Sequence, residues 1–346
     1  MGRTAHFSTL LTNSNLSDSA CIKNDWVEGH MYPAAYSLFF IVGFPANCLS
    51  LYVAWVLLKK GNNLAVYLVN LSISDLLYTV SLPVWIELAL GRPVGDTLCS
   101  LVSVVMYNSF YIGDGLLCCI ALNRYLAVVH PLKYPILRRF DTAVMISVAV
   151  WVLVVSFNAF TIIWIDSYNS EEQRAMCLDV FPLRDSLLQV SVARFVLGFL
   201  FPVLLVSFCC RGICVAVRAN QATEEQERRH VSQLLVVVLL TLGVCFGPIH
   251  VMMLLRGLLE HCGSPSWLFL PYKVSMAISA VNSVADPFLY CFITRLGKAN
   301  VTQVVHYLQR KRKGNGQEVV DKYGLMLCPE DTYCVAVSII VPGNHD

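Results

Sequence analysis

The 346-residue sequence carries little charge for its length. Only 14% of its residues are Asp, Glu, Lys or Arg, whereas 56% are hydrophobic. An ordinary soluble domain contains about 25% charged residues. This shortage excludes a chain that is surrounded by water on every side, and it indicates a membrane protein.

The sequence also lacks the local patterns that mark many catalytic centres. It contains no Gly-rich phosphate loop, no paired-carboxylate site and no Cys and His spacing suited to zinc. It shows no inverted repeat of the kind that builds many transporters, which argues against a transporter or channel. We therefore expect no enzyme activity, no zinc site, no organic cofactor and no nucleic-acid partner.

Seven apolar runs are present, and each is long enough for the roughly 20 residues that a helix needs to cross a bilayer core. They are 33–58, 64–90, 98–129, 142–165, 186–217, 231–255 and 267–293. They predict an all-α membrane protein with a seven-transmembrane helix bundle over 33–293, an N-terminal segment over 1–32 and a C-terminal segment over 294–346. Within the last segment, 295–313 predicts a short amphipathic helix 8 on the membrane surface.

Lys and Arg gather in the loops on one side of the predicted bundle, which places those loops in the cytoplasm. Because the number of spans is odd, the N-terminus is then extracellular, and we expect a multi-pass protein of the plasma membrane. The segment 1–32 is polar, lacks the apolar core of a signal peptide and contains the glycosylation sequon that starts at Asn15. A second sequon, at Asn300, falls on the cytoplasmic side and should remain unmodified.

Four of the fourteen cysteines lie at predicted extracellular positions, where the oxidising environment favours disulfides. They are Cys21, Cys99, Cys177 and Cys262. Four cysteines can pair in three ways, and the sequence alone does not select among them. Most of the other cysteines lie within the spans, where a small buried hydrophobic role is the simpler interpretation.

An ordered set of short motifs runs along the predicted spans. It comprises "GFPANCLSLYVAW", "LVNLSISDLLY", Trp151, "NRYLAVVHPL", "GFLFP", "CFGP" and "NSVADPFLY". Together these resemble the motifs of the rhodopsin-like (class A) G-protein-coupled receptors over about residues 33–310. The resemblance implies a receptor that signals through heterotrimeric G proteins.

The same resemblance implies several roles for individual residues. It pairs Cys99 with Cys177, and a finer likeness to one subgroup pairs Cys21 with Cys262. It implies a sodium-binding cluster of buried polar residues, and a G-protein contact region at the cytoplasmic end of the bundle. The first set is Asn47, Asp75, Asn282 and Asp286, and the second is Asn123, Arg124, Tyr125 and Tyr290.

Within class A, "LCCIALNRYLAVVHPL", "ARFVLGFLFP" and "CFGPIHVMMLLR" resemble the proton-sensing group, which includes the G2 accumulation receptor. That likeness implies activation by extracellular protons. Histidine, with an unperturbed pKa of about 6.5, titrates in the required range. His30 and His250 match histidine positions of the group. Their alternatives are an ordinary exposed residue for His30 and a hydrogen-bonded pocket residue for His250.

Departures from this group favour a second interpretation, a receptor for a lysophospholipid or an oxidised fatty acid with little or no proton activation. Lys273 stands where some relatives have a histidine, and Val154 replaces an acid of the fourth helix. Arg194, Arg256 and Lys273 could hold an anionic headgroup. Cationic side chains near helix ends also extend to the membrane interface when no ligand is present, which is the competing explanation.

Two polar residues of the third predicted span differ from the class A pattern. Asp114 stands ten residues before Arg124, about 15 Å along a helix, so it lies near the middle of the bilayer between Gly113 and Gly115. We interpret it as a buried titrating group, with an acid that is held neutral or hydrogen-bonded for structural reasons as the alternative. Asn123 replaces the usual acid beside Arg124, and an amide cannot form a charged pair with a guanidinium. This replacement predicts raised basal signalling.

Overall fold

The computed structural model describes residues 27–130, 132, 139–166, 185–219, 225–259 and 268–293, and within them all regular structure is helical. The elements are η2 (Val27–Met31), α1 (Tyr32–Lys59), α2 (Leu64–Ala89), α3 (Asp96–Val129), α4 (Phe140–Asp166), α5 (Asp185–Phe195), η5 (Val196–Leu200), α6 (Phe201–Ala219), α7 (Glu225–Thr241), η6 (Leu242–Phe246), α8 (Gly247–Leu259) and α9 (Phe269–Ile293). The chain divides into two units, Met1–Lys298 and Ala299–Asp346. The second unit, which would hold most of the predicted helix 8, lies outside the described residues.

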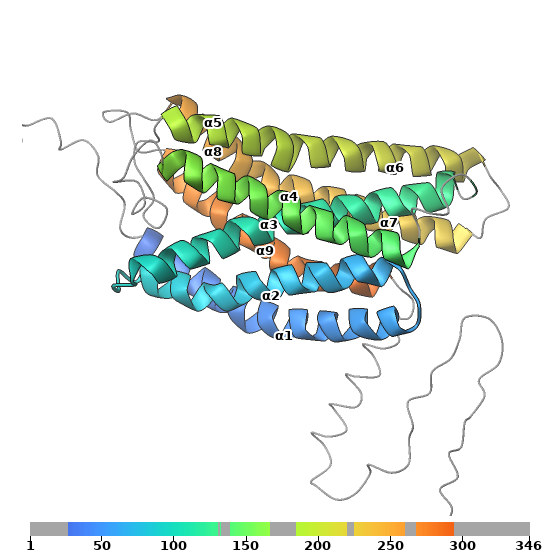
Figure 1. Ribbon diagram of the computed structural model, residues 1–346, viewed down its shortest axis with the longest axis horizontal. Helices are drawn as coiled ribbons and strands as arrows, with labels where there is room; N and C mark the ends of the chain where they lie inside the picture. Colours follow the sequence, from blue (N-terminus) through green and yellow to red (C-terminus); the bar gives the residue numbers. More distant parts are fainter. Residues whose placement is uncertain are drawn as a thin grey trace, which may run out of the picture. The chain divides into compact units, whose positions relative to one another are not determined.

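The described part forms seven continuous helical rods, because α5, η5 and α6 follow one another without a break, as do α7, η6 and α8. Figure 1 shows the rods running side by side. α3 contacts α2, α4, α6 and α7, so it occupies the centre of the bundle. We call the end at which α3 begins the Cys99 end and the opposite end the Arg124 end.

Two rods contain a π-helical turn, and each turn lies next to a proline. η5 precedes Pro202, and η6 precedes Pro248. Proline has no N–H to donate, and its ring clashes with the carbonyl group four residues earlier. Those carbonyl groups belong to Gly198 and Val244, which lie inside the two π-helical turns. The wider turn therefore gives the proline ring room without ending the helix.

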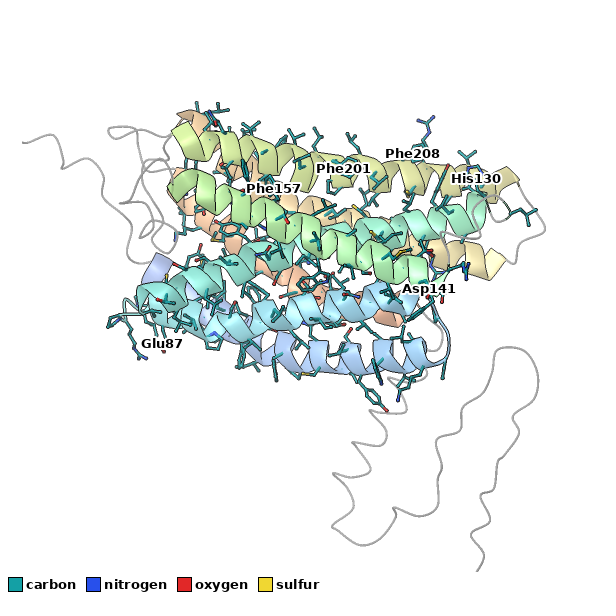
Figure 2. All side chains as sticks on the ribbon, viewed as in Figure 1. Glu87, His130, Asp141, Phe157, Phe201 and Phe208 are labelled. Atoms are coloured by element: carbon teal, nitrogen blue, oxygen red, sulfur yellow. The ribbon has the colours of Figure 1, made fainter. Side chains whose placement is uncertain are left out.

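The outer surface of the bundle differs from that of a water-soluble protein, although the core also contains many buried hydrophobic residues. Large apolar side chains face outward along the rods, including Leu153 on α4. Figure 2 shows two more, Phe201 and Phe208 on α6. Asn47, Asp75 and many serines are buried instead. Outward-facing apolar surface on this scale indicates a lipid environment, and polar groups inside such an environment face the interior.

Six helices are long and apolar enough to cross a membrane by length and composition alone, among the residues that the structure describes. They are Gly29–Lys59, Leu64–Ala89, Thr97–Val129, Phe140–Thr161, Leu188–Ala216 and Gln233–Leu259. The seventh rod, α9, forms where the sequence predicted a seventh span. Asn282, Ser283 and Asp286 on this rod are all buried.

Side-chain hydrogen bonds join neighbouring rods inside the bundle. Trp151 Nε1 on α4 donates to Asn70 Oδ1 on α2 at 3.0 Å. Asn158 Nδ2, also on α4, donates to Asn108 Oδ1 on α3 at 3.0 Å. Because lipid supplies no competing hydrogen-bond partners, such bonds help to fix the relative rotation of packed transmembrane helices.

Candidate ligand, ion and proton sites

Three buried carboxyl groups from three rods form one polar cluster near the middle of the bundle. They belong to Asp75 on α2, Asp114 on α3 and Asp286 on α9. Asp75 and Asp286 interact through their side chains, by charge and by hydrogen bonding. Asp114 interacts with Asp286 by charge. The structure therefore brings Asp114 into electrostatic interaction with Asp286, one of the two acids that the resemblance assigned to a sodium site.

Amide side chains complete this cluster. Asn282 Nδ2 donates to Asp286 Oδ2 at 3.1 Å. Asn47 Nδ2 donates to the backbone oxygen of Ser283 at 2.7 Å and so ties α1 to α9. The side-chain nitrogens of Asn47 and Asn282 thus both donate to protein acceptors. The side-chain oxygens of these two residues remain available to another partner.

The cluster is rich in buried oxygen atoms that have no hydrogen-bond partner. In the described part of the chain these are Asn47 Oδ1, Asp75 Oδ2, Asp114 Oδ1 and Oδ2, Asn282 Oδ1 and Asp286 Oδ1. Buried polar atoms in folded proteins are almost always satisfied, so a group of unsatisfied acceptors indicates that protons, water or a cation belong there. Oxygen ligands are also those that hard cations prefer.

A sodium ion fits this donor set better than a metal that needs three carboxylates. Within the described residues, no three His, Cys, Asp or Glu side chains are grouped closely enough to hold a metal ion. A monovalent cation would instead use Asp75 and Asp286 together with the oxygen of Asn282. All three side chains are buried.

The two glycines beside Asp114 face different neighbours. A Cβ atom on Gly113 would lie 3.6 Å from Leu71 Cδ1 and 4.0 Å from Asn282 Nδ2. A Cβ atom on Gly115 would lie 2.9 Å from Val150 Cγ1 on α4. Gly113 therefore borders the polar cluster, whereas Gly115 allows α3 and α4 to approach each other.

His250 on α8 is buried, and both of its ring nitrogens are engaged. Nδ1 lies 2.8 Å from the backbone oxygen of Phe246, which can only accept, so Nδ1 carries a proton. Nε2 lies 3.4 Å from the Tyr111 hydroxyl, which donates to it when the ring is neutral. The His250 ring also stacks on Phe199, with centroids 5.6 Å apart.

Protonation of His250 would reverse the direction of its contact with Tyr111, because Nε2–H would then donate to the hydroxyl oxygen. Tyr111 comes from α3, Phe199 from η5 and His250 from α8, so this change would act on three rods. Gly198 leaves room for the Tyr111 ring in this arrangement. A Cβ atom at position 198 would overlap Tyr111 Cε1 and would lie 2.8 Å from Tyr111 Cδ1. His250 is thus a buried, hydrogen-bonded residue, as one of the two alternatives from the sequence has it.

The three predicted ligand-binding cations each lie over a tyrosine ring near the Cys99 end. The Arg194 guanidinium carbon is 4.1 Å from the centroid of Tyr107 and 5.9 Å from that of Tyr111. The Arg256 carbon is 4.2 Å from the centroid of Tyr272. Lys273 Nζ is 5.0 Å from the centroid of Tyr32, whose hydroxyl donates to the Lys273 backbone oxygen at 3.0 Å.

The side chains of Arg256 and Lys273 are buried, whereas that of Arg194 is partly exposed. Arg256 is 2% exposed and Lys273 is 4% exposed. Sequence reasoning missed the tyrosines that cover them. One signal was available for Arg194, since Tyr107 and Tyr111 are four residues apart and lie on one face of a helix. The pairs of Arg256 with Tyr272 and of Lys273 with Tyr32 gave no such signal.

At the Arg124 end, Asn123 and Arg124 are partly exposed near the end of α3. The Tyr125 ring packs against Phe208 on α6, with centroids 5.3 Å apart, and against His130 at 5.7 Å. A Cβ atom on Gly212 would meet the Tyr125 ring, so Gly212 permits close packing of α3 on α6. The side chain of Tyr290 lies outside the described residues.

The remaining predicted site residues are outside or at the edge of the described part. His30 is exposed in η2. Cys99 is disulfide-bonded, and its predicted partner Cys177 lies outside the described residues, as do Cys21, Cys262 and Asn15. Both disulfide pairings and the glycosylation of Asn15 therefore stay predictions.

The described part of the chain forms seven helical rods with apolar outer faces and buried charged groups, which is the architecture of an integral membrane protein. The family model "7 transmembrane receptor (rhodopsin family)" matches residues 46–290 of the chain. The chain belongs to this family. It is a multi-pass G-protein-coupled receptor of the plasma membrane and not an enzyme.

Comparison with known proteins gives receptors of the same family. The chain is 35% identical over 320 residues to human G-protein coupled receptor 65, covering 86% of this chain and 95% of that protein. It is 32% identical over 310 residues to human G-protein coupled receptor 68, covering 87% and 85%. It is 28% identical over 283 residues to human probable G-protein coupled receptor 132, covering 78% and 72%.

Proposed function

We propose that this receptor is activated by extracellular protons through its buried acids and His250, with its N-terminus outside the cell. The carrying observation is the cluster of Asp75, Asp114 and Asp286, which come from three rods and include four carboxyl oxygens without a hydrogen-bond partner in the described part of the chain. A proton or cation that binds there changes the charge at the centre of the bundle. The resemblance of the sequence to the proton-sensing group supports the same function.

The proposed mechanism is a change in the balance between two helix arrangements. Asp75 and Asp286, with the oxygen of Asn282, would hold a sodium ion, which would balance one negative charge and favour the arrangement that brings α2 and α9 together. Protonation of these acids at lower pH removes their negative charge and so weakens their hold on a cation. Activation results only if protons bind more tightly to the active arrangement than to the inactive one.

His250 supplies a second response to protons, close to the π-helical turns of the fifth and sixth rods. Its protonation reverses the Tyr111 contact and alters the packing of Phe199, which lies in η5. The signal is read at the Arg124 end, where Arg124, Tyr125 and Tyr290 contact the G protein. π-helical turns are often found at functional hinges, which fits their position here.

The test measures second-messenger output in cells while extracellular pH falls from about 8 to about 6. This range brackets the unperturbed pKa of a histidine side chain. Output should rise as the pH falls. Replacing external sodium with choline should shift the midpoint pH of this response in the unaltered receptor. The same replacement should leave the midpoint pH of Asp75→Asn unchanged. A flat pH curve together with a response to lysophospholipid would contradict this proposal and support the lipid-receptor alternative.

A further inference from the structure

Four cysteines from two rods form a continuous chain of neighbouring thiol groups. Cys118 on α3 interacts with Cys209 on α6. Cys209 interacts with Cys210, and Cys210 interacts with Cys214. Each of the four carries a thiol and not a disulfide. The sequence indicated a small buried hydrophobic role for cysteines within the spans, and this role suits Cys118 and Cys209, which are both buried.

Cys210 and Cys214 are different, because both are partly exposed. Each follows directly after a buried residue of α6, Cys209 or Ile213, and so lies about 100° further around the helix, at the edge of its buried face. Residues four apart share one face of a helix, and the two thiols interact by hydrogen bonding. They therefore form an accessible pair of sulfur atoms that point the same way.

The pair lies towards the Arg124 end of the bundle. Cys210 stands between Phe208, whose ring packs on Tyr125, and Gly212, which borders the same ring. The proposed orientation of the receptor places this end in the cytoplasm, where thiols are kept reduced. Both sulfur atoms are then available as ligands.

The spacing of the two residues suits an atom between the sulfurs better than a bond between them. A disulfide needs Cβ atoms about 3.5–4.5 Å apart, whereas residues four apart on a helix have Cβ atoms about 5–6 Å apart. Two metal–sulfur bonds, each about 2.3 Å long in zinc sites, allow the sulfurs to lie up to about 4.6 Å apart. A bridging metal ion therefore fits this turn of α6 without distorting the helix.

We propose that Cys210 and Cys214 form a binding site for a soft metal ion, monovalent copper. Thiolate ligands select this ion, and two of them are enough because it accepts a nearly linear arrangement of two ligands. A structural zinc ion takes four ligands, and no group of three His, Cys, Asp or Glu side chains in the described part of the chain could hold a metal.

Binding at this site requires no change of oxidation state. Each thiol releases its proton to water as its sulfur–copper bond forms, and the copper ion stays monovalent. The bound ion would link successive turns of α6 beside the contact of Phe208 with Tyr125. The proposal does not depend on activation by protons, because the acid cluster belongs to α2, α3 and α9, whereas both thiols belong to α6.

The test measures copper binding to the purified full-length receptor in lipid nanodiscs under argon. Monovalent copper is added as its complex with the chelator bicinchoninate, and the loss of the colour of this complex reports transfer of the ion to the protein. We expect Cys210→Ser and Cys214→Ser each to weaken binding by more than about a hundredfold, because even the loss of an outer partner of a metal ligand costs about 10- to 100-fold.

Cys48→Ser is the matched control, because it removes an exposed thiol of α1 and should leave copper binding unchanged. A second variant, Cys214→Ser/Val215→Cys, keeps the number of thiols but moves one of them about 100° around the helix to an exposed position. It should bind copper as weakly as Cys214→Ser. Thermal unfolding without copper shows whether each variant is folded.

The proposal is overturned if the unaltered receptor binds no copper tightly. It is also overturned if the variants at Cys210 and Cys214, the displaced-thiol variant included, bind as much copper and as tightly as Cys48→Ser. Zinc is the second probe. Tight zinc binding that is lost in the same variants would overturn the assignment to monovalent copper.

Discussion

At the scale of single residues, Asp114 links the sequence to the proposed mechanism. It is 2% exposed, and neither carboxyl oxygen has a hydrogen-bond partner in the described part of the chain. A carboxyl group held for structural reasons would be expected to have such partners. This environment favours the interpretation of Asp114 as a titrating group.

Replacing Asp114 with asparagine should mimic the protonated acid without changing its size. If protonation of Asp114 promotes activation, Asp114→Asn should respond at higher pH, with a midpoint displaced by on the order of one unit, equivalent to about 1.4 kcal/mol. The measurement is second-messenger output against pH at matched surface expression. Asp141→Asn, on the exposed Asp141, is the control, and an unchanged curve for Asp114→Asn would remove this residue from the mechanism.

The neighbouring prediction concerns Asn123, which cannot form a charged pair with Arg124. Restoring the acid with Asn123→Asp should add an attraction that holds the inactive state and should lower ligand-free output. Basal second-messenger levels at a pH of about 8 provide the measurement. Equal basal output from the two receptors would show that this pair does not restrain activation here.

Gly198 provides a prediction about packing. Gly198→Ala would force the Tyr111 ring away, because the new Cβ atom would lie 2.8 Å from Tyr111 Cδ1, and overpacking of this kind costs about 1–3 kcal/mol. Gly243→Ala is the matched control, since Gly243 also lies in a π-helical turn but has no atom within 4 Å of the added Cβ. Thermal unfolding should show a lower temperature for the first variant only.

At the scale of elements, the π-helical turns set the direction in which the side chains of α5 and α8, at the Cys99 end of the fifth and sixth rods, point. One residue more per turn rotates everything before it by about 100° relative to a regular α-helix. In the fifth rod this rotation determines where Arg194 lies relative to Tyr107. The motif "GFLFP" contains the proline that accompanies the turn, but it does not show by itself that the turn is π-helical.

Deleting Leu197 from η5 should convert this turn to a regular α-helix. The Pro202 ring would then clash with the Gly198 carbonyl, at a cost of about 3 kcal/mol. Arg194 would also rotate away from Tyr107. Leu197→Ala is the control, because it keeps the register and truncates a side chain that is 59% exposed. Similar unfolding temperatures for the two variants would show that the π-helical turn is not required.

At the scale of the whole molecule, two solvents act on one chain. The outer faces of the rods are apolar, while acids, amides and cations occupy the interior. A bilayer places water at both ends of the bundle and lipid around its middle. Which end of the bundle faces the outside of the cell depends on the whole chain in its membrane. It must therefore be tested on the complete receptor.

The two sequons provide that test. If the N-terminus is extracellular, removal of N-linked glycans should lower the apparent mass of the unaltered receptor. Asn15→Gln should abolish this mass change, whereas Asn300→Gln should not affect it. A mass change that depends on Asn300 would reverse the proposed orientation.

Much of the architecture could be predicted because it depends on local composition. The predicted spans agree with the rods to within a few residues at most ends; for example, 33–58 corresponds to Tyr32–Lys59. The largest difference is at α7, which begins at Glu225 and not at residue 231. The apolar run stops at the membrane boundary, but the Glu, Gln and Arg residues before it are good helix formers and extend the helix.

The sequence by itself determined the class of protein, the number of spans and the presence of costly charged residues within them, because bilayer thickness and the cost of burying charge act on composition alone. The tertiary structure decided which groups meet. It placed Asp114 with Asp286, Arg194 over Tyr107 and His250 between Tyr111 and Phe199. These contacts join residues far apart in the chain, and they depend on the rotation and packing of whole helices.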